Sequence, residues 1–206
     1  MTSKRHDEIF PGRGDIGRAA REARLGQKGL TVWMTGLSAS GKSTTAYALE
    51  KYLTEQGHFC YVLDGDNLRC GINANLDFSP PARKENIRRV AEIAYLMNDA
   101  GLIAICSLIS PLAEDRDMAR RIIGKEHFFE VYLNTPLEVC EARDSKQLYS
   151  KARKGLIPDF TGISAPYQAP PSPDFIVNTS HIEPGIIGMS IADQIQARIV
   201  NEPMTE

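Results

Sequence analysis

Short apolar runs alternate along the chain with longer stretches in which apolar residues recur at helical spacing. The apolar runs predict strands over residues 31–35, 59–63, 102–109, 128–133 and 174–178. The longer stretches predict helices over residues 43–55, 81–100, 114–124, 136–143 and 184–200. Strands that are joined by helical crossovers form a mostly parallel sheet with helices on both faces. The pattern therefore predicts an α/β fold.

Two parts of the chain interrupt this alternation. Residues 1–24 predict a leader that is partly disordered, with a short amphipathic helix over residues 16–25. Residues 144–173 are rich in Lys, Pro and Gly, which is typical of a mobile lid or loop. We therefore expect one domain over residues 25–206, with a lid at about residues 143–165.

The segment between the first strand and the first long helix carries a phosphate-binding pattern. It reads Gly36-Leu37-Ser38-Ala39-Ser40-Gly41-Lys42-Ser43. The glycines of this spacing let the backbone turn tightly and direct its N–H groups at phosphate oxygens. We expect Lys42 to reach the β- and γ-phosphates of a nucleoside triphosphate, and Ser43 to hold Mg²⁺ at the helix N-terminus. A loop that matched by chance would lack the flanking strand and helix.

A positive cluster in the predicted lid can close over the phosphates and exclude water. Its members are Arg143, Lys146, Lys151, Arg153 and Lys154. A charged surface loop explains the last three equally well. The predicted ATP-binding residues are Gly36, Leu37, Ser38, Ala39, Ser40, Gly41, Lys42, Ser43, Thr44 and Arg143.

Composition and charge narrow the classes of function. The 206 residues are enough for one α/β domain with a sizeable core, and a formal net charge of −2 gives no reason to expect a nucleic-acid or membrane surface. No apolar run approaches the length of a membrane span and the N-terminus does not resemble a signal peptide, so we expect a cytoplasmic location. The cysteines are widely spaced, which predicts reduced thiols rather than a structural metal site. They are Cys60, Cys70, Cys106 and Cys140.

Five motifs follow one another over roughly residues 20–200. They are the phosphate loop, Leu63-Asp64-Gly65-Asp66-Asn67-Leu68-Arg69, Arg83-Lys84-Glu85-Asn86-Ile87-Arg88-Arg89-Val90, Ile109-Ser110-Pro111 and Phe160-Thr161-Gly162-Ile163. The phosphate loop alone is shared with many kinases, whereas the other four in this order are far more specific. Together they resemble the adenylylsulfate kinase family. The resemblance implies a P-loop kinase that uses ATP and Mg²⁺ to phosphorylate the 3′-hydroxyl of adenylylsulfate, giving 3′-phosphoadenylylsulfate and ADP in sulfate assimilation.

Two carboxylates follow the second predicted strand, at the end where α/β sheets bind ligands. Asp66 can orient or deprotonate the acceptor hydroxyl, the catalytic and substrate-binding role that the resemblance implies. Asp64 can support Mg²⁺ through water, so we expect Ser43 and Asp64 to form the metal site. The alternative for both carboxylates is a solvated turn that caps a helix, because Asp-Gly-Asp-Asn is also good turn chemistry. The predicted catalytic residues are Asp66, Lys42 and Ser110.

The expected acceptor carries phosphate, sulfate and adenine, so its pocket needs cations and a flat apolar clamp. Arg69 and Arg83 offer guanidinium groups that match phosphate or sulfate oxygens, and Asn86 lies about one helical turn from Arg83. By resemblance, these three residues bind adenylylsulfate. The resemblance also implies that Phe78 and Phe160 stack on its adenine. Core packing is the alternative for either phenylalanine.

Further acceptor contacts are expected beyond this group. In the family, the serine that matches Ser110 is often described as a phosphoserine intermediate. Direct in-line transfer needs no covalent step and no base adjoins Ser110 in the sequence, so we expect it to line the acceptor pocket with Ile109. By resemblance, Lys146 contacts adenylylsulfate, and Asp159 and Phe160 lie at the far end of the lid.

The chain departs from the family pattern at five positions. The family usually has His at Cys70, Gly at Asp77 and Asp159, Tyr or Phe at Leu112, and Lys at Ser150. These changes spare the phosphate loop and the predicted base, but they concern the acceptor side. A lost positive charge near the lid predicts weaker anion binding, by about 1 kcal/mol per exposed contact.

Two other functions stay open at this point. One is a P-loop kinase with a different acceptor, such as a nucleoside, gluconate or shikimate. The other is a nucleotide-binding regulatory domain without transfer, which loss of Lys42, Ser43 or Asp66 would indicate, although all three are present. A purely structural role has little support beyond the leader helix. The resemblance implies a homodimer.

Overall fold

The computed structural model describes residues 12 and 14–200 of the chain. The partial disorder that the sequence predicts for the leader falls mostly on residues outside this range. The strands are β1 (Leu30–Thr35), β2 (Cys60–Asp64), β3 (Ile103–Ser107), β4 (Phe128–Leu133) and β5 (Phe175–Val177). The helices are α1 (Arg18–Leu25), α2 (Lys42–Glu55), α3 (Gly65–Arg69), α4 (Pro80–Asp99), α5 (Ala113–Ile123), α6 (Leu137–Ala142), α7 (Leu148–Arg153) and α8 (Pro184–Ile199), with a 3₁₀ turn at Lys125–His127.

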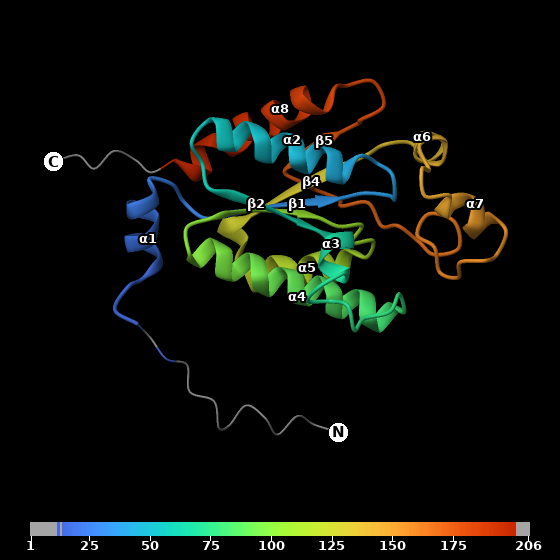
Figure 1. Cartoon of the computed structure of the whole chain (residues 1–206), viewed down its shortest axis with the longest axis horizontal. Coiled ribbons are helices and arrows are strands. Elements are labelled where there is room, and N and C mark those ends of the chain that lie inside the picture. Colours follow the sequence, from blue (N-terminus) through green and yellow to red (C-terminus); the bar gives the residue numbers. More distant parts are fainter. Residues whose placement is uncertain (1–11, 13, 201–206) are drawn as a thin grey trace.

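The strands form one sheet in the order β2-β3-β1-β4-β5, and each pair of neighbours is parallel. The central strand, β1, pairs with β3 at Leu30 and Ile103 and with β4 at Thr31 and Phe128. All of β1 is buried because it has a strand on each side and helices on both faces. The predicted parallel α/β fold is confirmed (Figure 1).

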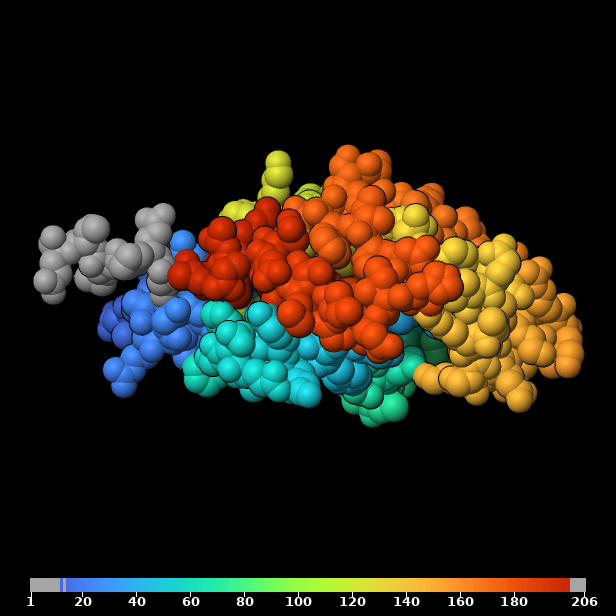
Figure 2. Space-filling view, turned by 90° about the horizontal axis from the view of Figure 1, so that it is seen from above, coloured from blue at the N-terminus to red at the C-terminus, as the bar shows by residue number. Residues whose placement is uncertain are grey.

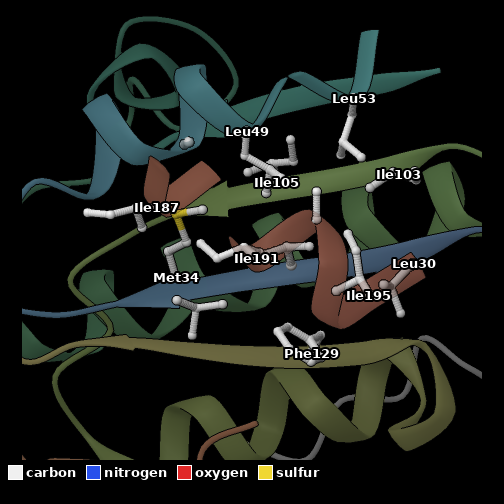
Figure 3. Packing of buried hydrophobic residues seen from close by; sticks show 14 of the residues in the cluster. Leu30, Met34, Leu49, Leu53, Ile103, Ile105, Phe129, Ile187, Ile191 and Ile195 are labelled. Carbon is white, nitrogen blue, oxygen red and sulfur yellow. The ribbon is translucent and has the colours of Figure 1, made fainter. Parts of the chain in front are cut away.

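One face of the sheet is covered by α2 and α8, which pack against each other. Leu49 and Leu53 of α2 meet Ile187, Ile191 and Ile195 of α8 over the apolar side chains of the strands (Figure 3). The two helices approach closely at Gly188, where a Cβ would lie 2.9 Å from the backbone nitrogen of Leu49. Each buried Leu or Ile of this layer stabilises the fold by about 1.5–3 kcal/mol before entropic costs. This layer therefore holds α2, and with it the phosphate loop, in place.

The opposite face is covered by α4 and α5. Trp33 of β1 is fully buried there and stacks on Phe128 of β4, with ring centroids 5.7 Å apart. The helices contribute Ile87, Val90, Ala91, Ala94, Ala119 and Ile123 to this second core cluster. The predicted helices on both faces are thereby confirmed.

Three local features differ from the prediction. The short helix α3 is unpredicted, and it forms because the Asp64 carboxylate accepts the backbone N–H groups of Asp66 and Asn67 at 3.0 and 3.3 Å. Residues 144–173 are not a helix-free loop, since they include α7. β3 ends at Ser107 rather than at residue 109, and Ser110 beyond it adopts a φ of 39° that no extended strand allows.

The leader helix α1 packs on its own domain at the end of the molecule opposite α6 and α7 (Figures 1 and 2). Arg21 of α1 forms an ion pair with Asp99 at 2.5 Å. The buried Gln27 side chain donates to the carbonyls of Phe59 and Gly101 at 2.9 and 2.8 Å, which ties the start of β1 to its neighbours. No helix among residues 14–200 is long and apolar enough to cross a lipid bilayer.

Candidate active site

Three of the predicted site segments begin at the carboxyl ends of β1, β2 and β3 (Figure 1). The phosphate loop follows β1, α3 follows β2, and the segment 108–112 follows β3. The strands are parallel, so their carboxyl ends share one edge of the sheet, where α/β proteins bind ligands.

The two glycines of the phosphate loop meet different constraints. Gly41 is the N-cap of α2 and has a φ of 95°, a backbone conformation that is strained in residues with a side chain. At Gly36 the limit is space, because a Cβ would lie 2.8 Å from the carbonyl oxygen of Leu133. The backbone N–H groups at the N-terminus of α2 lack partners within the helix and are available to an anion.

The Lys42 side chain lies along the inside of the loop. Its Nζ donates to the carbonyls of Gly36 and Leu37 at 3.0 and 2.6 Å. Burial lowers the pKa of Lys42 to about 8. The ammonium is therefore mainly charged at neutral pH, yet it has little water to compete with a phosphate.

Two buried threonines and an arginine brace the loop from the side of α6 and β5. The hydroxyls of Thr135 and Thr179 both donate to the Ser40 carbonyl, at 3.0 and 2.9 Å, and lie 3.0 Å from each other. Arg143 donates from Nη1 to the Thr179 hydroxyl at 2.7 Å and from Nη2 to the Thr179 carbonyl at 2.8 Å. The structure thus brings Arg143 to the same network that holds the loop.

Hydroxyl and carboxylate oxygens gather beside the start of α2. Ser43 donates to Asp64 at 2.6 Å, and its Oγ lies 3.3 Å from that of Ser107. Hard oxygen donors of this kind are what Mg²⁺ prefers, so the residues fit that ion. Among the described residues there is no cluster of three or more His, Cys, Asp or Glu side chains that could hold a metal. Mg²⁺ is commonly bound through one or two carboxylates together with substrate phosphates and water, and the carboxylate of Asp64 beside Ser43 fits that pattern.

Asp66 lies in the first turn of α3, and its carboxylate forms an ion pair with Lys146 from the segment between α6 and α7. Both side chains are largely exposed. The hydrogen bond to Asp66 raises the pKa of Lys146, so its amine stays protonated. The predicted base and the predicted lid cation are therefore in direct contact.

The acceptor side gathers Arg69, Phe78, Arg83 and Asp159. The guanidinium of Arg69 lies 4.3 Å from the ring centroid of Phe78, whose side chain is 66% exposed. Arg83 donates from Nε to the Phe78 carbonyl at 2.7 Å and from Nη2 to the Asp159 carbonyl at 2.8 Å. Burial, followed by repulsion from Arg83, lowers the pKa of Arg69. An exposed aromatic face flanked by two cations is a suitable platform for a flat anionic ligand.

Two predicted acceptor residues are enclosed by other side chains. The side-chain amide of Asn73 donates to the side-chain oxygen Oδ1 of Asn86 at 3.0 Å, and both residues are buried. Phe160 packs edge-on against Tyr149, with centroids 5.0 Å apart and an interplanar angle of 76°. Phe160 is therefore buried, whereas Phe78 is exposed. Arg83 links the two segments, because it donates to the Phe78 carbonyl and to the carbonyl of Asp159, the residue before Phe160.

Ser110 is buried and its hydroxyl already has a partner. Trp33 donates to Ser110 Oγ at 3.2 Å. The Ser110 carbonyl accepts from Arg116 at 2.8 Å, and the neighbouring Ile109 carbonyl accepts from Thr35 at 2.8 Å. These bonds fix the backbone of the segment after β3.

The departures from the family pattern have local explanations in part. Asp77 accepts from the backbone and hydroxyl of Ser79 at 3.0 and 2.6 Å, at the start of α4. Asp159 has a φ of 52°, a conformation that glycine adopts most readily and Asp tolerates. Cys70 and Ser150 are exposed. Nothing in the structure explains Leu112.

Known proteins resemble this chain over most of its length. The family model described as Adenylylsulphate kinase matches residues 28–178. The adenylyl-sulfate kinase of Clostridium acetobutylicum is 52% identical over 179 residues, which cover 87% of this chain and 89% of that protein. The chain belongs to the adenylylsulfate kinase family. The adenylyl-sulfate kinase of Phocaeicola vulgatus is 55% identical over 167 residues, covering 81% of this chain and 82% of that protein.

A solved structure supports the same family. The APS kinase of Mycobacterium tuberculosis in complex with AMPPNP and APS is 47% identical, with a TM-score of 0.79 over 82% of this chain and 98% of that chain. The P-loop kinase fold and the enzyme class that the sequence predicts are therefore confirmed. The roles of the individual site residues stay predictions.

Four residues that contact the phosphate loop or Ser43 were not predicted from the sequence. They are Ser107, Thr135, Tyr149 and Thr179. Thr135 and Thr179 come just after the strands predicted over residues 128–133 and 174–178, so the rule that flagged Asp64 would have flagged them too. Ser107 lay inside the strand predicted over residues 102–109, and Tyr149 contacts Ser38 across 111 positions of sequence, so neither residue carried such a signal.

Proposed function

We propose that the protein transfers the γ-phosphate of MgATP to the 3′-hydroxyl of adenylylsulfate, giving 3′-phosphoadenylylsulfate and ADP. The observation that carries this proposal is the placement of two aspartates. Asp64 accepts the hydroxyl of Ser43 at the phosphate loop, and Asp66 follows it two residues later, on the side of the Arg69 and Arg83 pair. The donor and acceptor functions therefore meet at one short segment.

On the donor side, the N–H groups at the start of α2 and the Lys42 ammonium hold the β- and γ-phosphates. Ser43 and Asp64 would hold Mg²⁺, directly and through water. When bound with ATP, this ion neutralises charge on the phosphate oxygens. Arg143 completes the nucleotide site from the lid, where it also bonds to Thr179.

On the acceptor side, Phe78 offers its face to the adenine, and the guanidinium groups of Arg69 and Arg83 attract the phosphate and sulfate. Lys146 adds a third cation next to Asp66. Phosphoryl transfer depends on such positioning more than on covalent help from the protein.

The transfer itself is in line. The 3′-oxygen bonds to the γ-phosphorus while the bond from that phosphorus to the β–γ bridging oxygen breaks. ADP leaves with the bridging oxygen, and the hydroxyl proton goes to the Asp66 carboxylate. Ser110 is a positioning residue in this scheme, because its buried hydroxyl accepts from Trp33 and its carbonyl from Arg116.

The cellular setting belongs to the same proposal. The reaction would serve sulfate activation in the cytoplasm, with no nucleic acid or membrane as partner. A homodimer is part of it, and light scattering of the purified protein tests that part separately. If the protein is a monomer in this measurement, the proposed homodimer is wrong and the proposed reaction still stands.

The test of the reaction is ADP formation with MgATP, with and without adenylylsulfate. Lys42→Ala and Asp66→Asn remove the predicted phosphate ligand and base, and Asp193→Asn on the exposed side of α8 is the matched control. We expect adenylylsulfate to stimulate ADP formation in the parent protein and in the control. We expect Asp66→Asn to lower kcat by about 10²- to 10⁴-fold.

Each alternative function gives a different result. ADP formation that responds to a nucleoside, gluconate or shikimate but not to adenylylsulfate would identify a kinase with another acceptor. Binding of ATP with no transfer to any of these acceptors would indicate a regulatory domain. Either result would overturn the proposed reaction.

A further inference from the structure

Tyr149 of α7 lies between the phosphate loop and a predicted acceptor residue. Its side chain is buried, at 2% exposure, although it comes from the segment predicted as a lid. The phenol hydroxyl donates to the backbone carbonyl of Ser38 at 2.9 Å. The ring meets Phe160 edge-on at 5.0 Å. One side chain thus contacts elements of both predicted substrate sites.

The backbone around Tyr149 is held firmly in this place. The Asp144 carboxylate accepts the N–H groups of Leu148 and Tyr149 at 2.8 and 2.7 Å, at the start of α7. Gln147 turns the chain into the helix with a φ of 54°. A helix of six residues has little stability of its own, so these bonds and the packing of Tyr149 fix it.

Apolar packing continues the link in both directions. Tyr149 and Phe160 share a buried cluster with Cys140, and Leu37 and Ala39 of the phosphate loop pack against that cluster. Since interiors are close-packed, a change in the loop is felt by its neighbours in the cluster. The phosphate loop and the segment 148–163 therefore share one small core.

We propose that Tyr149 is a positioning residue that couples nucleotide binding at the phosphate loop to acceptor binding beside Phe160. The inference rests on the proposed function, because it takes adenylylsulfate as the acceptor. The Tyr149 hydroxyl holds the Ser38 carbonyl, next to Ala39 with its φ of 56°, and the ring sets the place of Phe160. A nucleotide that orders the loop thereby orders the acceptor clamp.

A proton-transfer role for Tyr149 does not fit its surroundings. Burial raises the pKa of the phenol well above its ordinary value, so the hydroxyl stays protonated at neutral pH. Its proton is directed at a backbone carbonyl rather than at a substrate. Tyr149 therefore acts through its contacts with Ser38 and Phe160, which hold these two residues in a fixed arrangement.

The experiment measures the coupling directly. The Kd of adenylylsulfate is determined by calorimetry without and with saturating Mg²⁺ and AMPPNP, and the ratio of the two values is the coupling factor. We expect a factor of at least about 5 in the parent protein, the lower end of typical couplings. Tyr149→Phe, which removes one hydroxyl and keeps the ring, is expected to bring the factor close to 1.

Two further variants complete the design. Tyr61→Phe removes a phenol hydroxyl from a side chain that is 60% exposed on β2, and it should leave the coupling factor unchanged. Phe160→Leu disturbs the other side of Tyr149 and should lower the factor, with no additional loss in the double variant Tyr149→Phe/Phe160→Leu.

The outcomes separate the two proposals. If the parent protein binds adenylylsulfate and the factor is unchanged in Tyr149→Phe, or is already 1 in the parent, the inference is wrong while the proposed reaction stands. If the parent protein forms no adenylylsulfate-dependent ADP and does not bind the compound, the proposed reaction fails and the inference fails with it.

Discussion

Lys146, between α6 and α7, forms an ion pair with Asp66 at the start of α3, across 80 positions of sequence. The pair joins the predicted lid to the predicted base. In the proposed reaction the anionic groups of the acceptor attract the ammonium, and the carboxylate is then available to the 3′-hydroxyl. The pair is exposed, so its contribution to the free energy of unfolding is at most about 1 kcal/mol.

Removing this cation should therefore affect the acceptor and not the fold. We expect Lys146→Ala to raise the KM for adenylylsulfate by about 10-fold, the loss of one hydrogen bond to a charged group, and to leave the KM for ATP almost unchanged. Steady-state kinetics with each substrate varied in turn measures both. Lys154→Ala, in the exposed turn after α7, is the control, and an equal effect of the two substitutions would contradict a specific role for Lys146.

The hydrogen bond from Ser43 to Asp64 predicts a defect in metal use. Groups that orient metal ligands typically cost 10- to 100-fold in affinity when they are changed. We expect Asp64→Asn to raise the Mg²⁺ concentration for half-maximal activity by about 10-fold or more, because the amide accepts weakly and carries no charge. A titration of activity with Mg²⁺ at fixed ATP measures it. An unchanged midpoint would remove Asp64 from the metal site.

Lys42 gives a prediction for proton uptake. Its pKa of about 8 lies below the ordinary value of 10.5 because it is buried, and phosphates beside it should raise the value again. Binding of Mg²⁺ and AMPPNP at pH 9 should therefore take up close to one proton, and binding at pH 7 almost none. Calorimetry in buffers of different ionisation enthalpy reports this uptake. Lys42→Met should show none at either pH.

The lowered pKa of Lys42 also predicts how the free energy of unfolding changes with pH. Between pH 8 and 10.5 the unfolded chain holds more protons on Lys42 than the native protein does, so this residue makes the free energy of unfolding increase with pH in that window. The parent protein should gain stability relative to Lys42→Met from pH 8 to pH 10. Urea denaturation at both values checks it, and an opposite trend would contradict the buried position of the ammonium.

Much of the fold and half of the site follow from local patterns in the sequence. Trp33 and its apolar neighbours on β1 predict a buried strand, and the Gly36–Ser43 spacing predicts the phosphate loop directly. Long-range contacts escaped such reasoning. Tyr149 meets Ser38 across 111 positions, and Thr179 meets Ser40 across 139, and no local pattern encodes either partner.

The short helices α3 and α7 were missed for a related reason. α7 lies in a segment rich in Lys, Pro and Gly, where intrinsic propensity favours a loop, and it forms because Asp144 caps it and Tyr149 anchors it. The alternative that the sequence left open for Asp-Gly-Asp-Asn was a turn that caps a helix, and the Asp64 carboxylate does cap α3 while it also accepts from Ser43.

The left-handed backbone at Asp159 predicts how this position responds to substitution. Asp159→Gly removes the strain of a φ of 52° but adds freedom to the unfolded chain, so the free energy of unfolding should change by less than about 1 kcal/mol. Asp159→Val places a β-branched side chain there and should lower stability by about 1–2 kcal/mol. Thermal denaturation of the three proteins measures this. Equal stability of the Gly and Val variants would contradict a left-handed backbone at residue 159.

The most direct test of the central claim identifies the product. The protein is incubated with Mg²⁺, adenylylsulfate and ATP labelled at the γ-phosphate, and the labelled compound is identified by mass spectrometry and phosphorus NMR. The account predicts label on the 3′-oxygen of adenylylsulfate in equal amount to ADP, and labelling that is slower by about 10²- to 10⁴-fold in Asp66→Asn. Label that appears only in inorganic phosphate, or on another hydroxyl, would contradict it.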